Sequence, residues 1–373
     1  MKALITFRNN AYFNRLLAAW RGVKPCSTPE RLMKLDLGQQ PRTKLKKESA
    51  MSENHPLGSN RRHFLTMAGA GAAGITLFPE ARLWSAVQTG GDSSTKITTG
   101  KLRFALCNEM FENSTIADVC GIISKLGYQG IEIAPYTLAP SADAVTATQR
   151  AQIRKVIKDN GLETVGLHWL LAKTTGFHMT TPDDAVYRRT KDYFNVLIEL
   201  CHDLGGKVMV IGSPKQRSLV DGQTYAGAWK RAVEMFHGAC DKARDAGVTL
   251  CIEPLGKTET DFVNTVAEGL KMMREINHPN FKVHLDVKAM AAEGKSSIPE
   301  IIRSIKANEI GHFHVNDANL YGPGMGQVDY GPIAAAVREI RWKKWLSVEV
   351  FKYDPDPTTI ARSSIEYLKR YKW

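Results

Sequence analysis

The chain has 373 residues, and 43% of them are hydrophobic, which is enough apolar material for one large domain or two small ones. Its 50 Lys and Arg residues exceed its 38 Asp and Glu residues, but 14 of the basic and only 5 of the acidic residues lie within residues 1–86. The rest of the chain is therefore close to neutral, which argues against nucleic acid as a partner.

The first segment with a recognisable pattern is "SNRRHFLTMAGAGAAGITLF", residues 59–78, where Arg61 and Arg62 precede a Gly- and Ala-rich apolar stretch. The pattern resembles a twin-arginine export signal, so we expect residues 59–86 to direct the protein to the periplasm, with cleavage near Ala86. The apolar stretch is roughly a dozen residues long and a membrane span needs about 20, so we expect no stable span. An uncleaved anchor and a disordered basic arm are the alternatives.

Such a signal normally stands near the start of a chain, yet residues 1–58 precede its basic pair. We expect these residues to be a disordered leader. Met51 is a better start position, which would make the preceding residues an over-extended gene model. Residues 87–100 are expected to be a linker.

From residue 101 onward, short apolar segments alternate with longer amphipathic ones. The predicted strands are Leu102–Cys107, Gly130–Ala134, Thr164–His168, Lys207–Ile211, Val248–Glu253, Phe281–Val287, Ile310–Val315 and Leu346–Val350. The clearest predicted helices cover residues 114–127, 148–161, 228–247 and 263–276, where apolar residues recur at spacings of three and four. Gly127, Gly161 and Gly247 end three of these segments and suit a left-handed helix terminus.

Eight strand–helix units in about 270 residues are typical of an α/β protein with a (β/α)₈ or TIM barrel, which we assign to residues 101–373. A doubly wound open sheet is the alternative, but no G-x-G-x-x-G opens the first unit. In a TIM barrel the active site lies at the C-terminal ends of the strands, so those ends are where we look for chemistry.

The six cysteines are scattered along the chain and form no C-x-x-C pair. Their apolar surroundings are typical of buried thiols rather than of a disulfide framework or a zinc knuckle.

Four polar residues lie at or next to the ends of four successive predicted strands: Glu253, Asp286, His314 and Glu349. Neighbouring strands are about 5 Å apart, so these side chains can converge. Three crowded carboxylates repel one another unless a cation neutralises them, which predicts one divalent metal ion. Three oxygen donors and an imidazole favour Mn²⁺, and Mg²⁺, Co²⁺ and Zn²⁺ also fit. Each residue alone also has an ordinary explanation as a loop acceptor or helix cap.

The stretches "IEPLGKTETDFVNT", "HLDVKAM", "GHFHVNDA", "GPGMGQVDY" and "SVEVF" resemble the xylose isomerase-like barrels, which include sugar phosphate isomerases and ketohexose 3-epimerases. The resemblance covers residues 101–373. It implies that Glu253, Asp286, His314 and Glu349 bind one divalent metal. It also implies that Glu253 and Glu349 are the catalytic acid/base pair.

Removing a proton next to a carbonyl is difficult at neutral pH, and a metal chelated by the substrate's carbonyl and hydroxyl oxygens stabilises the resulting enediolate. Two carboxylates on opposite faces of the substrate then move the proton. Its return to the same carbon gives epimerisation, and its return to the neighbouring carbon gives aldose–ketose isomerisation.

The resemblance is incomplete at the substrate pocket. In the ketohexose epimerases a histidine lies three residues after the strand-six aspartate, and an arginine lies six after the strand-seven histidine. Here these positions are Ala289 and Leu320. A substrate other than a plain ketohexose is therefore expected.

Other polar residues are candidates for substrate binding. His168 and Trp169 follow strand three, and Lys215 and Arg217 lie on the loop after strand four. Each also has an ordinary reading: a satisfied core histidine, a core tryptophan or a solvated basic loop. A mobile loop over the site is expected at residues 322–326.

Strand alternation directs the Glu132 side chain into the barrel, as a substrate contact or a buried structural acceptor, and Glu109 is close enough to reach the same cavity. His284 and His312 lie two residues before Asp286 and His314, which predicts that they support the metal ligands from one layer below. Lys257 either contacts substrate or is exposed.

We therefore expect a metal-dependent isomerase or epimerase of a sugar or sugar derivative. The main alternative is a lyase or dehydratase that acts on a keto-sugar, such as a 3-keto-glycoside or an inosose, with the same metal and acid/base pair. A DNA-repair endonuclease needs more histidines and a basic face. A non-catalytic sugar-binding barrel does not need both Glu253 and Glu349. The partner is expected to be a small sugar, and a homo-oligomer is compatible with the sequence.

Overall fold

The structure is a computed structural model that describes residues 102–373. Eight parallel strands pair in chain order and close into a barrel, with β8 hydrogen-bonded to β1. The strands are β1 Arg103–Cys107, β2 Gly130–Ile133, β3 Glu163–Leu167, β4 Val208–Ile211, β5 Thr249–Ile252, β6 Phe281–Asp286, β7 Ile310–Val315 and β8 Trp345–Val348. The expected TIM barrel and all eight predicted strands are confirmed, with ends that differ by at most two residues.

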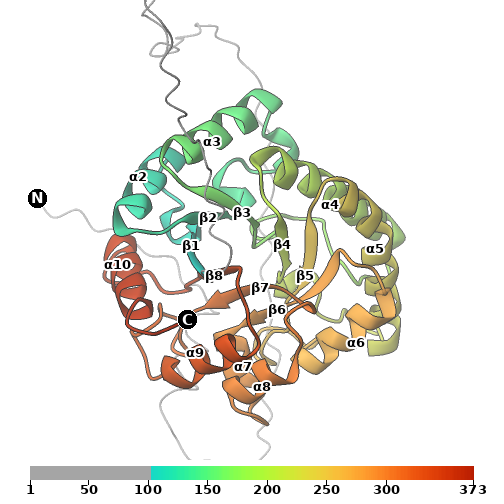
Figure 1. Ribbon diagram of the computed structural model, residues 1–373. Coiled ribbons are helices and arrows are strands. Elements are labelled where there is room, and N and C mark those ends of the chain that lie inside the picture. The colour runs from blue at the N-terminus through green and yellow to red at the C-terminus, as the bar shows by residue number, and fades with distance from the viewer. Residues whose placement is uncertain (1–101) are drawn as a thin grey trace, which may run out of the picture. The chain divides into compact units, whose positions relative to one another are not determined.

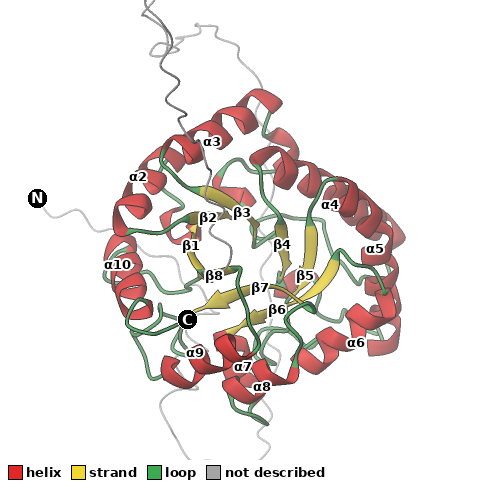
Figure 2. Ribbon diagram, in the orientation of Figure 1, coloured by secondary structure: helices red, strands yellow, loops and turns green. Residues whose placement is uncertain are grey.

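Helices surround the strands on the outside (Figures 1 and 2). They are α2 Ile116–Leu126, α3 Ala147–Asp159, α4 Asp184–Leu204, α5 Tyr225–Asp245, α6 Val266–Ile276, α7 Val287–Glu293, α8 Ile298–Ser304, α9 Tyr330–Glu339 and α10 Pro357–Leu368. Short 3₁₀ turns follow β1 (η1, Asn108–Phe111), β2 (η2, Pro135–Thr137 and η3, Ala142–Ala144) and β4 (η4, Pro214–Gln216). The four helices predicted from periodicity are confirmed.

Side chains near the helix ends explain where several helices begin and end. Thr146 and Thr265 form capping boxes with Gln149 and Glu268, which pair the otherwise free N–H groups of the first turn. Gly127 lies at the end of α2 with φ of +90°, a conformation that glycine adopts without steric cost. These local signals direct each chain segment back toward the next strand.

The main core lies between the strands and the helices, where the outward-facing residues of the strands pack. The barrel interior is filled at one level by a small cluster of Ala105, Val165, Val208 and Cys251. Above that cluster, inward-facing residues on β6 and β7 are polar rather than apolar, including His284 and His312. The polar interior therefore marks the half of the barrel that contains the functional site.

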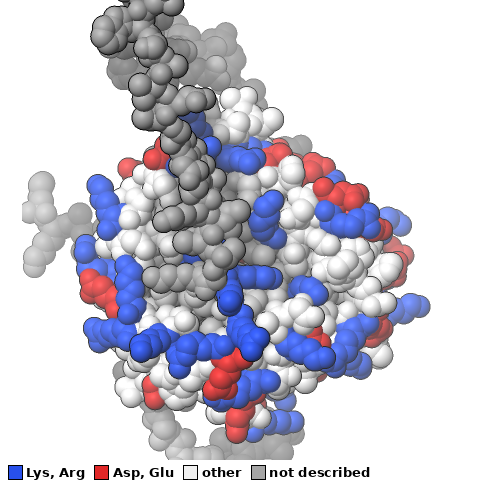
Figure 3. All heavy atoms as spheres, viewed as in Figure 1, with Lys and Arg blue, Asp and Glu red and all other residues white. Residues whose placement is uncertain are grey.

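In the view of Figure 3, basic side chains prevail along the left and lower rim, with some acidic side chains among them. Within residues 102–373, no helix is long and apolar enough to cross a membrane. The expected leader, signal and linker, up to residue 100, lie outside the described residues. All five cysteines in the described part of the chain are free and buried, as the sequence predicts.

Candidate metal centre and substrate cavity

The four residues expected to bind a metal come together at the C-terminal ends of β5 to β8. One potential donor atom from each of Glu253, Asp286, His314 and Glu349 lies within 4.8 Å of the other three. All four residues are at least 95% buried. Gly212 follows β4 and leaves room for this arrangement, because a Cβ there would lie 2.3 Å from Glu253 Oε2.

The electrostatics of this group favour a cation. Burial, together with the nearby Glu349 and Asp286 carboxylates, raises the pKa of Glu253 well above its usual value. Burial is also the main cause that raises the pKa of Asp286, to about 6. Burial opposes ionisation of Glu349 as well, but His314 outweighs it and lowers the pKa of Glu349. Crowded, poorly solvated carboxylates of this kind are stabilised by a bound divalent ion.

Two buried atoms at the centre of the group, His314 Nδ1 and Glu349 Oε2, face each other at 3.1 Å. Among the described residues neither atom makes a hydrogen bond of regular geometry. A buried polar atom without a partner is costly, and a metal ion that accepts lone pairs from both atoms removes that cost. Three carboxylates and one imidazole are a suitable donor set for Mn²⁺ and for related divalent ions. The residues present therefore fit a divalent metal.

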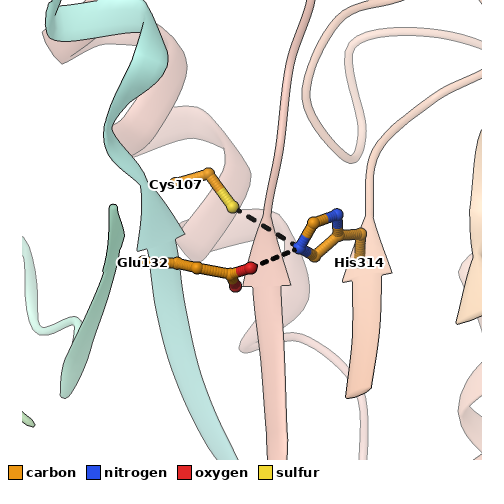
Figure 4. A group of neighbouring side chains, drawn as sticks. All are labelled: Cys107, Glu132 and His314. Atoms are coloured by element: carbon orange, nitrogen blue, oxygen red, sulfur yellow. Dashed lines mark hydrogen bonds and ion pairs between the residues drawn. The ribbon is translucent and has the colours of Figure 1, made fainter. Parts of the chain in front are cut away.

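His314 is oriented from the far side of its ring by Glu132 on β2. His314 Nε2 lies 3.0 Å from Glu132 Oε1, and Cys107 Sγ on β1 lies 3.7 Å from the same nitrogen (Figure 4). Burial opposes a charge on Glu132, but His312 and His314 outweigh it and lower its pKa well below the usual value. The Glu132 carboxylate thus holds the Nε2 side of the ring, and Nδ1 faces Glu349 Oε2 at 3.1 Å.

His312 and His284 occupy the layer below the metal group. His312 Nε2 lies 2.7 Å from Glu132 Oε2 and 3.0 Å from Ser347 Oγ, so it completes the support of the Glu132 carboxylate. The His284 ring centroid is 4.2 Å from that of His314, and His284 Nε2 is 4.0 Å from Glu253 Oε1. Burial lowers the pKa of His284 well below its usual value, so this imidazole packs against the group in its neutral form.

Two hydrogen-bond donors hold the Asp286 carboxylate. One of them, the Asn316 side chain, was not among the site residues expected from the sequence. Its Oδ1 accepts a hydrogen bond from Ala289 N at 2.7 Å, and its Oδ2 accepts one from Asn316 Nδ2 at 2.6 Å. Asn316 Oδ1 in turn accepts from Lys288 N at 2.8 Å. Asn316 could have been expected at the site, because alternate residues of a strand face the same side and His312 and His314 both face the barrel interior. Asp286 ends β6 and caps α7, so the predicted extension of that strand to Val287 was wrong by one residue.

Three other trios of possible metal ligands occur in the described part of the chain. They are Cys107, Glu132 and His314; Cys107, Glu109 and His168; and Glu253, His284 and His314. In the first two, the histidine already contacts the carboxylate: His314 Nε2 lies 3.0 Å from Glu132 Oε1, and His168 Nε2 lies 2.9 Å from Glu109 Oε2. The set of four contains two residues, Glu253 and Glu349, that also line an open cavity. It is therefore the group that a substrate and a metal can share.

The cavity beside Glu253 and Glu349 holds about 340 Å³. The other residues that line it are Trp169, Ala172, Lys173, Ser213, Pro214, Lys215, Gln216, Leu255, Glu259 and Phe351. A concave site with apolar and aromatic walls and a few polar groups is typical of small-molecule binding. Trp169 Nε1 donates a hydrogen bond to Glu349 Oε1 at 2.7 Å, which ties the aromatic wall to the proposed catalytic carboxylate.

The structure places the six expected substrate-binding residues in different surroundings. Trp169 and Lys215 line the cavity. Glu132 and His168 are fully buried beneath it, and Lys257 is exposed outside its lining. His168 and Glu132 therefore occupy support positions, where each bonds a partner within the barrel.

Arg217 also lies away from the cavity lining. Its guanidinium is 1% exposed and donates to the backbone carbonyls of Glu253 at 2.7 Å and of Ile211 and Val263 at 3.3 Å. The sequence placed this side chain toward substrate, but the structure directs it into the protein. The reason is that the Glu253 carbonyl accepts from Arg217, whereas the Ile211 and Val263 carbonyls also accept from the backbone N–H groups of Glu253 and Leu255, so the buried arginine links three backbone oxygens around the end of β5.

Lys288 and Glu259 form a polar pair at the cavity that the sequence analysis did not identify. Lys288 Nζ donates to Glu259 Oε1 at 2.7 Å and lies 4.0 Å from the centroid of the Phe351 ring. Lys288 is 7% exposed, and Glu259 and Phe351 both line the cavity.

The loop at residues 322–326 differs from its expected role. None of its residues lines the cavity. Instead it packs on α10, since a Cβ at Gly322 would lie 2.0 Å from Ser364 Oγ and one at Gly324 would lie 2.3 Å from the Tyr367 ring. The close packing explains the glycines of this segment without a lid function.

Comparisons with known proteins agree with this geometry. A family model described as a xylose isomerase-like TIM barrel matches residues 120–371. A D-psicose 3-epimerase of Agrobacterium fabrum is 33% identical over 235 residues, which are 61% of this chain and 77% of that protein.

Two solved structures have the same barrel. The crystal structure of a D-psicose 3-epimerase in the presence of D-fructose matches with a TM-score of 0.60 and 25% identity, over 71% of this chain and 89% of that one. A 3-keto-D-glucoside 4-epimerase from E. coli matches with a TM-score of 0.64 over 73% of this chain and 100% of that one. Its identity is 18%, so that likeness concerns the fold alone.

Proposed function

The chain belongs to the xylose isomerase-like TIM barrel family, and from this premise we propose that it is a divalent-metal-dependent epimerase of a ketose or keto-sugar. The observation that carries the proposal is the convergence of Glu253, Asp286, His314 and Glu349 beside an open cavity. The sugar 3-epimerases among its relatives support epimerisation at the carbon next to the carbonyl.

Under this proposal, the four converging residues hold one divalent ion, with Mn²⁺ favoured and Mg²⁺, Co²⁺ and Zn²⁺ as alternatives. When bound, the ion supplies positive charge that stabilises the negative charge developing on the substrate oxygens. The protein's own contribution is to hold the carboxylates in place. Asn316 and the backbone N–H of Ala289 fix Asp286, and Glu132 fixes His314.

Glu253 and Glu349 are the proposed acid/base pair. They come from strands three positions apart around the barrel, and both line the cavity. In the proposed complex the two carboxylates face opposite sides of the reacting carbon. One carboxylate takes the proton from the carbon next to the carbonyl, and the other returns a proton to the opposite face. Trp169 Nε1 bonds Glu349 Oε1 and keeps that oxygen directed at the cavity wall.

The test is proton exchange in D₂O with the Mn²⁺-loaded protein. D-fructose and other ketoses should incorporate deuterium at the carbon next to the carbonyl, and the epimer should appear in the NMR spectrum. Glu253→Gln and Glu349→Gln should each lower turnover by at least about 100-fold, since general acid–base catalysis contributes that much. A Glu163→Gln control removes an exposed carboxylate at the start of β3 and should leave turnover unchanged. Turnover that survives both active-site substitutions would contradict the proposal.

A lyase that acts on a keto-sugar is the second candidate. The specific observation in its favour is that Ala289 and Leu320 carry no polar side chains, so the expected grip on a ketohexose is missing. The same proton removal next to a ketone expels a group one carbon further along. Incubation with a 3-keto-glycoside and detection of the released group separates this reaction from epimerisation.

We also propose that residues 59–86 act as a twin-arginine signal and that the enzyme works in the periplasm. Its support is the Arg61-Arg62 pair followed by a short apolar stretch. The test expresses the unchanged chain and the double variant Arg61→Lys/Arg62→Lys and measures by cell fractionation how much of each reaches the periplasm. Equal distribution of the two forms would contradict it.

A further inference from the structure

A second hollow lies beside the catalytic cavity. It holds about 350 Å³ and is lined by residues 136–140 of the segment after β2, together with Lys173 from the segment after β3. Lys173 also lines the catalytic cavity, so the two hollows share one wall. The catalytic cavity itself, at about 340 Å³, is at the low end of the range for small-molecule sites. Together the two hollows about double the room for a ligand.

A row of aromatic rings runs from one hollow into the other. Tyr136 lies in the second hollow, and its ring centroid is 6.1 Å from that of Trp169. Trp169 in turn stacks on Phe351, with centroids 6.0 Å apart and an interplanar angle of 23°. All three rings are partly exposed. Lys173 lies over the Tyr136 ring and Lys288 over the Phe351 ring, and the exposed part of the row offers apolar ring surface to a bound molecule.

The charges of the second hollow disfavour an anionic ligand. Its one cationic side chain is Lys173, which already forms an ion pair with Glu112. Lys173 Nζ also lies 4.4 Å from the centroid of the Tyr136 ring. The rest of the lining is apolar or hydroxyl-bearing, so a phosphate there would lose its hydration without gaining a free cation.

The backbone of Trp169 is held in an uncommon conformation, with φ of +48°. A non-glycine residue pays a steric cost there, and such strain persists where the surrounding structure enforces it. Here the enforcement comes from the bond to Glu349 and the contacts with Tyr136 and Phe351. The side chain therefore stays at the junction of the two hollows.

We propose that the second hollow is a subsite for a second sugar ring, linked to the sugar whose carbonyl carbon is in the catalytic cavity. The substrate class is then a glycosylated ketose, such as a ketose disaccharide, rather than a free ketose or a sugar phosphate. This inference rests on the proposed epimerase function. It also explains why the four metal-binding candidates are present although positions 289 and 320, expected to be polar in a ketohexose epimerase, are Ala and Leu.

The experiment compares kcat/KM for isomaltulose and maltulose with kcat/KM for D-fructose, using the Mn²⁺-loaded protein. Both disaccharides have a free ketose carbonyl and a free neighbouring hydroxyl. The disaccharide-to-fructose ratio should exceed one. Tyr136→Ala should lower this ratio about three- to tenfold, which is the scale of one lost ring contact.

Tyr321→Ala is the matched control. Tyr321 also has a lysine over its ring, with Lys352 Nζ 5.2 Å from the centroid, but it lines neither hollow. The ratio should not change in this variant. Ala139→Trp fills the second hollow without removing an existing contact, and it should lower the ratio even if Tyr136→Ala folds poorly.

A ratio of one or less, or equal losses for disaccharide and fructose in Tyr136→Ala and Ala139→Trp, would overturn the subsite. That result is distinct from failure of the proposed function. The function fails when no ketose, free or glycosylated, exchanges its proton in D₂O. The subsite alone fails when fructose exchanges normally and the second ring has no effect.

Discussion

The role of a buried charged side chain in this barrel depends on its hydrogen-bond partners. Glu132 is the clearest case, because it is fully buried and contacts the two imidazoles of His312 and His314. A carboxylate behind a metal-binding histidine fixes both the ring orientation and the position of its proton. The same residue type at the same depth would be a costly isolated charge without those rings.

Replacing Glu132 should therefore weaken metal binding although Glu132 is not in the group of four. We expect Glu132→Gln to lower the Mn²⁺ affinity about 10- to 100-fold, since partners of metal ligands typically have effects of this size. Calorimetric titration of the metal-free protein measures it. The control is Glu163→Gln, which removes an exposed carboxylate that pairs with Arg103. Unchanged affinity in Glu132→Gln would show that His314 needs no support from Glu132.

At the scale of elements, buried donors join strands to loops at the top of the barrel. Arg217 follows η4 and bonds carbonyls at the end of β4, at the end of β5 and in the segment before α6. Burial lowers the pKa of this guanidinium to about 10, so the group stays protonated at neutral pH. It therefore holds Glu253 in place through that residue's own backbone oxygen.

Arg217→Met keeps the apolar stem and removes the donors. The free energy of unfolding should fall by about 2–3 kcal/mol, because hydrogen bonds from a charged donor are lost and the Glu253 carbonyl is left without its donor. Urea unfolding of the metal-free protein gives this value. Arg303→Met, on the exposed face of α8, serves as the comparison and should leave stability unchanged. Similar midpoints for both variants would contradict the structural role of Arg217.

At the scale of the whole molecule, the metal group joins four of the eight strands. Glu253, Asp286, His314 and Glu349 lie at or next to the C-terminal ends of β5, β6, β7 and β8, and β8 closes the barrel on β1. Under the proposed function, an ion held by all four residues binds the folded state and not the unfolded chain. Folding and metal binding should then be linked.

We expect Mn²⁺ to raise the melting temperature and a chelator to reverse the rise. At a free concentration of 100 times Kd the added stability is about 2.7 kcal/mol. Differential scanning calorimetry with and without Mn²⁺ checks this. Asp286→Ala should abolish the shift, because it removes one ligand from the group, whereas Glu163→Gln should retain it. An identical melting temperature in Mn²⁺ and in chelator would exclude a specific ion at this group.

The sequence alone determined the architecture, because strand and helix periodicities and glycine helix ends are local properties that the chain carries residue by residue. It also determined the convergence of Glu253, Asp286, His314 and Glu349, because strand ends in a closed parallel barrel meet on one side.

Only the tertiary structure decided which neighbouring polar residues face the cavity. Arg217 was expected to reach substrate but turns inward, and Lys288 and Glu259 meet at the cavity although no spacing in the chain pairs them. Loop side chains lack the strict alternation of a strand, so their direction depends on which carbonyls need donors and which rings lie nearby. Those contacts join residues far apart in the chain, and they exist only once the barrel has closed.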